Sequence, residues 1–334
     1  MLPDPEITRR QMLRASALAA VALASASCSN NRRAPLTPLA SAPPPTPPVP
    51  DDRIIDIHQH TTYHGRSNEA LLHHQKRMGA TQTILLPGGS PVITESTLKG
   101  KANGLYAGAG TTDTCIAIAQ LFPREYFFGA NEVPDLPEAH ERIKKYLEQG
   151  AIVIGEQKFN LPVESPQMEM IYALAQEYRV PVLMHFQFET FNTGYERFGS
   201  VLKKWPNVTF IGHAQTMWAN IDAKHPDQKM LYPKGPVTPG GWTDRYLADH
   251  PNFYADMSAG SGLNALIRDE DHARKFIERH QDKLIFGSDC PDPAGMGPTC
   301  TGSSMIAAIR RLSPSNAVER KLLFHNAVRV FKLA

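Results

Sequence analysis

Short apolar runs alternate with longer amphipathic stretches from Arg53 to the end of the chain. Because the apolar runs are nearly continuous, they predict parallel strands that are buried on both faces. They occupy residues 53–58, 81–87, 126–131, 151–159, 180–186, 208–213, 253–258 and 283–289. Helical patterns lie between them, most clearly at residues 135–149, 166–179, 262–280 and 302–312.

Eight strand–helix units within roughly 280 residues predict an α/β fold, namely a (β/α)8 TIM barrel in a single domain. An open, doubly wound sheet also alternates strands and helices. The dinucleotide-binding form of that open sheet is excluded, because no Gly-x-Gly-x-x-Gly follows the first strand. Two long connections, residues 88–110 and 214–250, follow strand ends, where barrel enzymes place substrate-binding loops. In the second connection, Trp218 and Trp242 are candidates to cap a site.

The first 52 residues differ in composition from the rest of the chain. Arg9-Arg10 and an uncharged, alanine-rich run precede Cys28, which predicts a twin-arginine-type signal peptide over residues 1–28. Cys28 stands where a lipoprotein signal places its acylated cysteine, but Ser25 replaces the usual leucine, so lipidation stays open. Residues 29–52 are rich in proline and predict an extended tether before the domain at 53–334. The expected location is the periplasm, either free or anchored as a lipoprotein.

The net charge of the chain narrows the classes of partner that the protein is expected to bind. With 35 basic and 33 acidic residues the net charge is +2, which predicts no nucleic-acid binding. Membrane contact is expected only through a lipid on Cys28. A small molecule is therefore the expected partner, and a homo-oligomer is compatible with the sequence.

Cys290 and Cys300 could form a disulfide after export, and Cys115 would then stay free.

Ionisable residues stand at the carboxyl ends of five predicted strands, where barrel enzymes build their active sites. They are His58 and His60, Glu156 and Lys158, His185, His213, and Asp289. Alternation along a strand places the imidazoles of His58 and His60 on one side, about 6–7 Å apart. A third imidazole and a carboxylate would complete a set suited to zinc or a similar divalent ion. Asp56 lies two positions before His58, so the same alternation places its side chain on the side of both histidines. It is a candidate to orient them.

Several of these segments resemble the amidohydrolase superfamily, specifically its amidohydrolase-related (amidohydrolase 2) branch. They are Asp56-Ile57-His58-Gln59-His60, Met184-His185, Gly212-His213, Phe286-Gly287-Ser288-Asp289-Cys290-Pro291 and, in the last helix, Asn326-Ala327. The resemblance covers residues 53–334 and implies a metal-dependent hydrolase on a TIM barrel. It implies that a divalent metal, Zn²⁺ in the first place and Mn²⁺ as an alternative, is bound by His58, His60, His185 and Asp289.

The resemblance also implies catalytic roles. A metal-activated hydroxide would attack the carbonyl carbon of an amide, lactone or ester, and Asp289 would pass its proton to the leaving group. His213 would bind a second ion or polarise the carbonyl group. In strand four, Ile152, Ile154, Glu156 and Lys158 alternate onto one side, so both polar residues could face the barrel mouth. Glu156 is the predicted ligand, and an ion pair between Glu156 and Lys158 is the alternative. The site is expected to hold one or two ions, and one is favoured without a carboxylated lysine as a bridge.

The same residues fit a second reaction, the non-oxidative decarboxylation of an aromatic or unsaturated acid. That reaction needs a cation for the substrate carboxylate, and Arg66 and Arg245 are candidates. A third hypothesis, a tethered binding protein without catalysis, predicts missing ligands, yet every expected position is filled. We expect Asp256, Ser258 and His64 to line the pocket. Histidines expected on helix surfaces are His73, His74, His140, His272 and His280.

Overall fold

The computed structural model describes residues 52–101 and 108–333. The expected signal peptide, Cys28 and nearly all of the predicted tether lie outside the described residues, as do residues 102–107 of the first long connection. Residues 51–334 form one compact unit. Within its described part, every helix is too short or too polar to cross a membrane.

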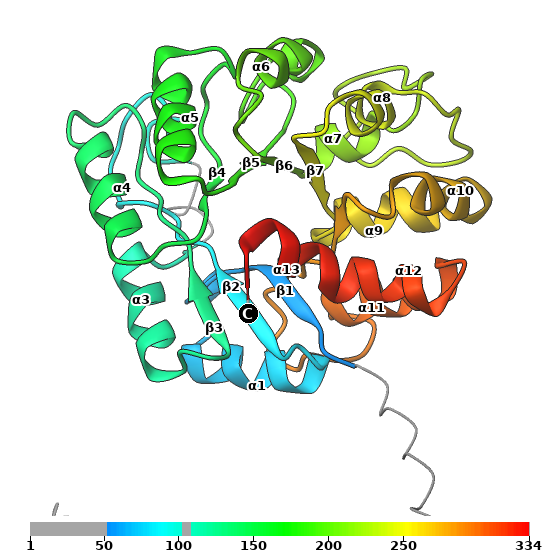
Figure 1. The fold of residues 1–334 in the computed structure, drawn as a ribbon, viewed down its shortest axis with the longest axis horizontal. Coiled ribbons are helices and arrows are strands. Elements are labelled where there is room, and N and C mark those ends of the chain that lie inside the picture. The colour runs from blue at the N-terminus through cyan, green and yellow to red at the C-terminus, as the bar shows by residue number, and fades with distance from the viewer. Residues whose placement is uncertain (1–51, 102–107, 334) are drawn as a thin grey trace, which may run out of the picture. The chain divides into compact units, whose positions relative to one another are not determined.

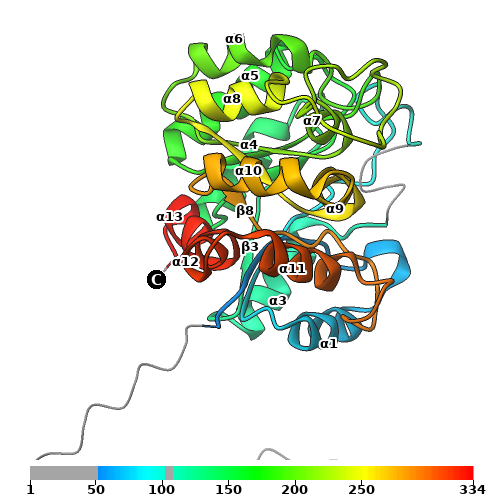
Figure 2. The ribbon, with the colours of Figure 1, turned by 90° about the vertical axis from the view of Figure 1, so that its right-hand side faces the viewer.

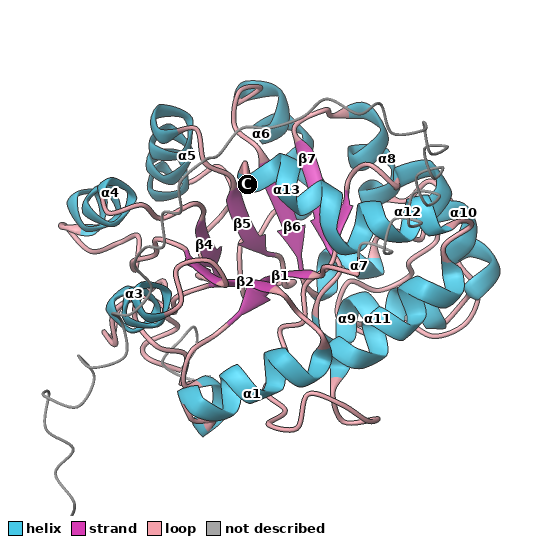
Figure 3. Cartoon of the chain, turned by 60° about the horizontal axis from the view of Figure 1, so that its bottom comes forward, coloured by secondary structure: helices cyan, strands magenta, loops and turns pink. Residues whose placement is uncertain are grey.

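Over the described part of this unit, eight parallel strands alternate with helices (Figure 1). The strands are β1 (Ile55–Gln59), β2 (Gln82–Leu85), β3 (Tyr126–Phe128), β4 (Ile154–Gln157), β5 (Val182–His185), β6 (Phe210–His213), β7 (Phe253–Asp256) and β8 (Leu284–Ile285). Strands β1 to β3 pair in one sheet and β4 to β8 in another. Backbone hydrogen bonds join the two sheets on both sides, from Gly155 N to Ala130 O at 2.9 Å and from Asp289 N to His58 O at 2.8 Å. The strands therefore form the predicted (β/α)8 barrel, with the helices outside it (Figure 3).

The helices begin and end largely where local signals predict. Ser165 accepts a hydrogen bond from Met168 N and precedes Pro166, so α5 starts with a capped first turn. The helices are α1 (Asn68–Met78), α3 (Thr112–Leu121), α4 (Ala139–Glu148), α5 (Pro166–Tyr178), α6 (Phe198–Lys204), α7 (Gln215–Ala219), α8 (Trp242–Asp249), α9 (Ala259–Ile267), α10 (Glu270–His280), α11 (Thr301–Leu312), α12 (Asn316–Arg320) and α13 (Asn326–Phe331). Short 3-10 segments occur at Tyr63–Gly65 and Tyr195–Arg197, and a π-helical turn at Lys321–His325.

Several predicted elements are shorter in the structure, strands three, four and eight among them, and one predicted helix is divided. The single helix expected over 262–280 is wrong: α9 ends at Ile267, and Asp269 accepts a hydrogen bond from His272 N at 3.0 Å and starts α10 as a cap. Strand eight is shorter than predicted. The amide of Phe286 donates to Leu322 O at 2.9 Å, while Phe286 O and the Asp289 amide still bond to β1.

Apolar side chains fill the middle of the barrel and leave its carboxyl end to polar groups. One buried cluster draws on six strand segments, with Ile55, Ile57, Ile84, Leu86, Val153, Leu183, Ile211 and Ile285. Phe324 and Phe331 of the last helical segments join this cluster. Asn326 ties those segments to β8, because its Nδ2 donates to Leu284 O at 2.8 Å.

Strict alternation of side chains is interrupted in β1. The register of β1 on β2 shifts within residues 56–59. Such an irregularity changes the face that the following side chains take. Asp56 consequently faces α1, where it accepts a hydrogen bond from Gln75 Nε2 at 2.8 Å. The expectation that Asp56 lies on the same side as the ring of His58 is therefore wrong.

The second long connection contains helices α7 and α8. Trp218 lies in α7 and is 2% exposed, and its Nε1 donates to Asp256 O at 3.0 Å. Trp242 starts α8 and packs against the main apolar core. Trp218 thus stabilises the barrel wall and does not cap the site.

Of the five histidines predicted on helix surfaces, His73 and His140 are exposed as expected. The other three, His74, His272 and His280, are buried. Helix α10 packs between α8 and α11 (Figure 2), which covers its inner face. His280 Nε2 lies 2.6 Å from Asp244 Oδ1, and Arg279 donates to Asp244 Oδ2 at 3.0 Å. Periodicity showed that α10 is amphipathic, but not that a buried carboxylate of α8 faces its histidine.

Replacing Asp244 with asparagine is expected to destabilise the domain by about 3 kcal/mol at neutral pH. Burial opposes ionisation of Asp244, but His280, the Gly240 amide and Arg279 hold its pKa below the usual value. A carboxylate with a lowered pKa stabilises the fold above its unfolded pKa and loses that contribution as the pH falls. The difference between variant and wild type should therefore shrink below about pH 4. Chemical denaturation across this range measures it, with exposed Asp249→Asn on the same helix as control.

Candidate functional site

His58 and His60 present their Nε2 atoms to each other at the carboxyl end of β1. His58 Nδ1 lies 2.6 Å from Asp256 Oδ2, and His60 Nδ1 lies 2.7 Å from Leu86 O. Both partners are acceptors, so each Nδ1 carries the hydrogen, and each neutral ring then has a lone pair on Nε2. The two Nε2 atoms are 3.1 Å apart. Two lone pairs at this distance require a proton or a cation between them.

Two carboxylates approach the same point. Asp289 Oδ1 lies 3.8 Å from His58 Nε2 and 3.5 Å from His60 Nε2. Glu156 Oε2 lies 3.7 Å and 3.5 Å from the same two atoms. Ligand atoms around a tetrahedral zinc ion are about 3.3 Å apart, so this spacing suits one divalent ion. Asp289 Oδ1 is also buried without a hydrogen-bond partner among the described residues, a deficit that an ion at this point removes.

Glu156 reaches the site because β4 is irregular. The register of β4 on β5 shifts within residues 154–157. Ile154 packs in the outer core beneath the helices, yet Glu156, two residues on, contacts the histidines inside. The shared parity predicted for these two residues is therefore wrong, although Glu156 does lie in the site.

His213 lies on the other side of both carboxylates. Its Nε2 is 3.5 Å from Asp289 Oδ2 and 3.6 Å from Glu156 Oε1. Its Nδ1 is 2.9 Å from Ser258 Oγ, which in turn donates to Asp256 Oδ2 at 2.8 Å. Asp256 at the end of β7 therefore orients His213 through Ser258 and His58 directly.

Asp56 acts on the backbone of the site. Its Oδ1 accepts hydrogen bonds from Ser288 N at 2.8 Å and from His58 N at 3.1 Å. Ser288 precedes Asp289, so Asp56 holds the segment that presents this carboxylate. The carboxylate that orients the imidazole rings is Asp256, which was predicted only to line the pocket.

His185 lies beside the site, and both of its ring nitrogens face protein partners. Nδ1 is 2.6 Å from Glu156 Oε1, and Nε2 is 3.2 Å from Gln187 Oε1. Glu156 Oε2 and Asp289 Oδ1 each lie within 3.8 Å of the Nε2 atoms of His58 and His60. Among the described residues, two sets have ligand atoms that all lie within 4.8 Å of one another: His58, His60 and Asp289, and His58, Glu156 and His213. His185 contacts these sets through Glu156. Its predicted role as a ligand stays a prediction.

Burial and charge set the protonation of the cluster. Burial alone would lower the pKa of His58, but the charges of Asp289 and Asp256 raise it well above its usual value. Burial opposes ionisation of Asp289, but His58, His213 and His60 hold its pKa well below the usual range. The carboxylates are thus anionic and require nearby positive charge, which imidazolium rings or a divalent ion can supply.

Lys158 supplies positive charge beside the site without pairing with Glu156. Its ammonium lies 5.8 Å from the ring centre of Phe191, and the ion pairs of Glu156 within the described chain are all with histidines. The alternative of a Glu156–Lys158 ion pair is therefore wrong. Burial opposes ionisation of Glu156, but Lys158 and His185 hold its pKa well below the usual value. Burial and Lys158 together lower the pKa of His185 to about 4.

The two arginines considered for a substrate carboxylate do not face the site. Arg66 is buried and donates to the carbonyl oxygens of Cys290 at 2.7 Å and Asp292 at 3.1 Å. It also donates to Gln59 Oε1 at 2.6 Å. Arg245 is exposed on α8. Arg66 thus positions the segment after β8, and neither arginine takes the predicted role.

Tyr63 is a site residue that sequence reasoning missed. Its ring centre lies 4.7 Å from that of His60, and burial together with the charge of Asp289 raises the pKa of Tyr63. His64, which was expected to contact substrate, is exposed, and its ring centre lies 4.6 Å from that of Tyr63. Its predicted role stays a prediction. An available signal was the position of an aromatic residue three places after His60, in the first loop at the carboxyl end of the barrel.

A (β/α)8 barrel with histidines and carboxylates at the carboxyl ends of its strands is typical of metal-dependent barrel enzymes. Comparison with known protein families agrees with this class. The chain belongs to the amidohydrolase family, whose model, described as Amidohydrolase, matches residues 55–333. No curated protein matches the chain.

Solved structures share the barrel fold at low identity. The chain is similar to 2,6-dihydroxybenzoate decarboxylase from Rhizobium, with a TM-score of 0.51 at 14% identity over 84% of this chain and 99% of that chain. It is similar to a dihydroxybenzoic acid decarboxylase from Polaromonas sp. JS666 with bound manganese and 2-nitroresorcinol, with a TM-score of 0.51 at 13% identity over 84% and 97%. It is also similar to a probable 2-pyrone-4,6-dicarboxylic acid hydrolase from Acinetobacter baumannii with citric acid bound, with a TM-score of 0.50 at 12% identity over 84% and 99%.

Proposed function

We propose that this protein is a metal-dependent hydrolase whose ion is held by His58, His60, Glu156 and Asp289. The observation that carries the proposal is the 3.1 Å approach of the two Nε2 atoms, each on a ring whose Nδ1 already donates to the protein. When bound, a divalent ion such as Zn²⁺ or Mn²⁺ supplies Lewis acidity, which acidifies water and polarises a carbonyl group. The spacing of the four ligand atoms supports one ion, with His185 as the partner of Glu156.

Asp289 is the residue proposed to move the proton. Its Oδ1 faces the two histidines of β1, and its Oδ2 faces His213 Nε2 at 3.5 Å. A proton accepted by Asp289 can therefore be given to a leaving group that lies between these two sides. His213, oriented at Nδ1 by Ser258, presents its Nε2 to stabilise the substrate oxygen on which negative charge develops.

The proposed substrate is a small molecule that carries an anionic group. Lys158 contributes positive charge near His185, whose ring packs edge-on against Phe191 with the centres 5.4 Å apart. Gln187, which contacts His185, lines a cavity of about 330 Å³ together with Phe188, Asn192 and Thr216. Such a volume suits a compact ligand.

Non-oxidative decarboxylation of an aromatic or unsaturated acid is the second candidate function. Lys158 favours it, because this reaction needs a cation to hold the substrate carboxylate, and the two arginines considered for that role lie elsewhere. The reaction type and the anionic substrate are separable, since an anionic lactone, ester or amide also suits Lys158.

Parallel assays of the metal-loaded full chain test these functions. We expect acid release from carboxylated lactones, esters or amides; release of CO2 from hydroxybenzoates without hydrolysis would establish the second candidate. Lys158→Met is expected to raise KM for carboxylated substrates by about tenfold, which is the loss of about 1.4 kcal/mol of binding. Exposed Lys203→Met on α6 is the matched control. Equal effects of Lys158→Met on charged and uncharged substrates would refute the anionic subsite.

A further inference from the structure

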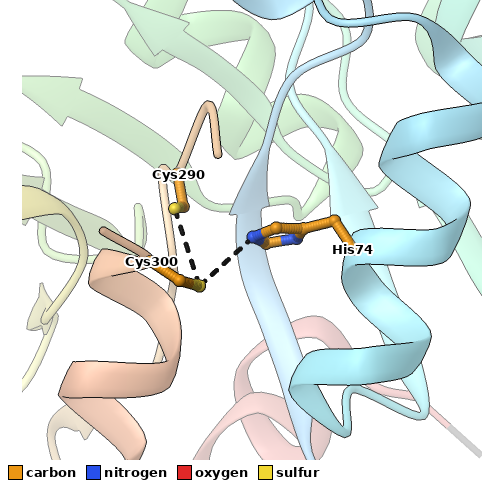
Figure 4. Close-up of side chains that lie close together, drawn as sticks. All are labelled: His74, Cys290 and Cys300. Atoms are coloured by element: carbon orange, nitrogen blue, oxygen red, sulfur yellow. Dashed lines mark hydrogen bonds between the residues drawn. The ribbon is translucent and has the colours of Figure 1, made fainter. Parts of the chain in front are cut away.

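A second group of metal-ligating side chains lies apart from the four proposed ligands. It consists of His74 on α1, Cys290 in the segment after β8, and Cys300 at the start of α11 (Figure 4). All three side chains are fully buried, and both cysteines are free thiols in this structure. His74 points from its helix toward the two sulfur atoms, so the group joins the first helix of the barrel to the last strand–helix connection.

The distances within this group are those of ligands around one ion. Cys290 Sγ lies 3.8 Å from Cys300 Sγ, and Cys300 Sγ lies 3.4 Å from His74 Nε2. With zinc bond lengths of about 2.3 Å to sulfur and about 2.0 Å to nitrogen, tetrahedral geometry separates two sulfurs by about 3.8 Å and sulfur from nitrogen by about 3.5 Å. A disulfide would instead bring the sulfurs to about 2.05 Å and would give the imidazole no part.

We propose that His74, Cys290 and Cys300 bind a thiophilic divalent ion, zinc or a close chemical relative. Binding deprotonates the two thiols and releases both protons to solvent. The two thiolates then neutralise the ion, and the neutral imidazole adds a third ligand without charge. A complex with no net charge can occupy a buried position that would penalise an isolated ion heavily. The remaining coordination position of a tetrahedral ion is filled by a ligand from outside this set.

Such an ion would fix the segment that follows Asp289. Asp289 directly precedes Cys290 and has a φ of 42°, so its backbone is confined to the left-handed region. The segment already lies tightly on α1: a Cβ at Gly295 would be 2.3 Å from His74 O, and one at Gly302 would be 2.3 Å from Met78 Sδ. The inference does not depend on the reaction proposed above, because it concerns different ligand atoms.

Cobalt substitution tests the site, because thiolate ligands give Co²⁺ a strong near-ultraviolet charge-transfer band that histidine and carboxylate ligands do not. The full chain, purified under reducing conditions, is loaded with Co²⁺ and, separately, with Zn²⁺. We expect the band in wild type and its loss in Cys300→Ser, with one bound zinc fewer per chain. Serine preserves the helix start, since Cys300 Sγ accepts from Ser303 N and a serine hydroxyl can do the same. Buried Cys115→Ser, whose sulfur contacts Thr61, is the matched control and should keep the band.

Several results would overturn the proposal. One is a cobalt-loaded wild type without the charge-transfer band, a measurement that needs no variant to fold. Another is a band that survives in Cys300→Ser. A third is an intact mass lower by two hydrogen atoms with Cys290 and Cys300 resistant to thiol reagents, which would show a disulfide in place of the ion. Metal at the proposed catalytic centre is counted independently, because Cys300→Ser leaves its four ligands in place.

Discussion

Asp289→Asn is expected to lower kcat by roughly 10³-fold or more, since it removes both a charged ligand and the proposed proton carrier. Asparagine has nearly the same shape and tolerates positive φ, so the backbone at this position should persist. The amide oxygen carries no full charge, and it cannot accept the proton that a carboxylate accepts. Tight metal binding should therefore weaken together with turnover. Metal content of the purified protein and steady-state kinetics measure the two effects.

The control for this prediction is Asp282→Asn, an exposed aspartate that pairs with Lys321 shortly before β8. It should leave metal content and turnover near wild type. If Asp289→Asn keeps its metal and loses less than about tenfold in kcat, Asp289 neither binds the ion tightly nor carries the proton, and the proposed mechanism fails.

His213→Asn is expected to lower kcat by about 10²- to 10³-fold while the ion at His58 and His60 remains bound. The reason is geometric: His213 Nε2 faces Asp289 Oδ2 and Glu156 Oε1, on the side of the carboxylates away from the β1 histidines. The variant removes the donor for developing negative charge and leaves all four proposed ligands. Metal counting separates this role from the alternative predicted from the sequence, because a second ion at His213 would be lost with the ring.

The matched control is His140→Asn, an exposed histidine on α4. It should change neither kcat nor metal content. Wild-type turnover in His213→Asn would exclude both roles of His213, and the loss of one bound ion per chain relative to wild type would support a two-metal centre in place of carbonyl polarisation.

Patterns within single elements predicted the architecture well. Continuous apolar runs indicated eight buried parallel strands, and the strand ends indicated the polar edge of the barrel, because both signals depend only on local sequence. Helix starts such as Ser165-Pro166 were readable for the same reason. Predictions that needed the facing element were less successful. His280 reads as a surface histidine until the carboxylate of Asp244 on α8 is placed opposite it.

Strict alternation was the weakest assumption. It predicted Asp56 on the side of the His58 ring and Ile154 on the side of Glu156, and register shifts in β1 and β4 break both relations. A register shift depends on pairing with a neighbouring strand, so it cannot be predicted from the sequence of the shifted strand alone. The metal-site prediction nevertheless included Glu156, because a polar residue at the carboxyl end of a strand lies at the barrel mouth whether or not the register of that strand shifts.

For this protein the sequence by itself determined the barrel, its family and the residue types at the carboxyl ends of the strands. The tertiary structure decided which atoms meet. It placed the lone pairs of His58 and His60 on Nε2, because Asp256 and Leu86 O occupy both Nδ1 atoms. It gave Arg66 a positioning role and brought His74 to Cys290 and Cys300, over 200 positions away along the chain. Hydrogen bonds and ligand sets join residues far apart in the chain, and closure of the barrel alone brings them within bonding distance.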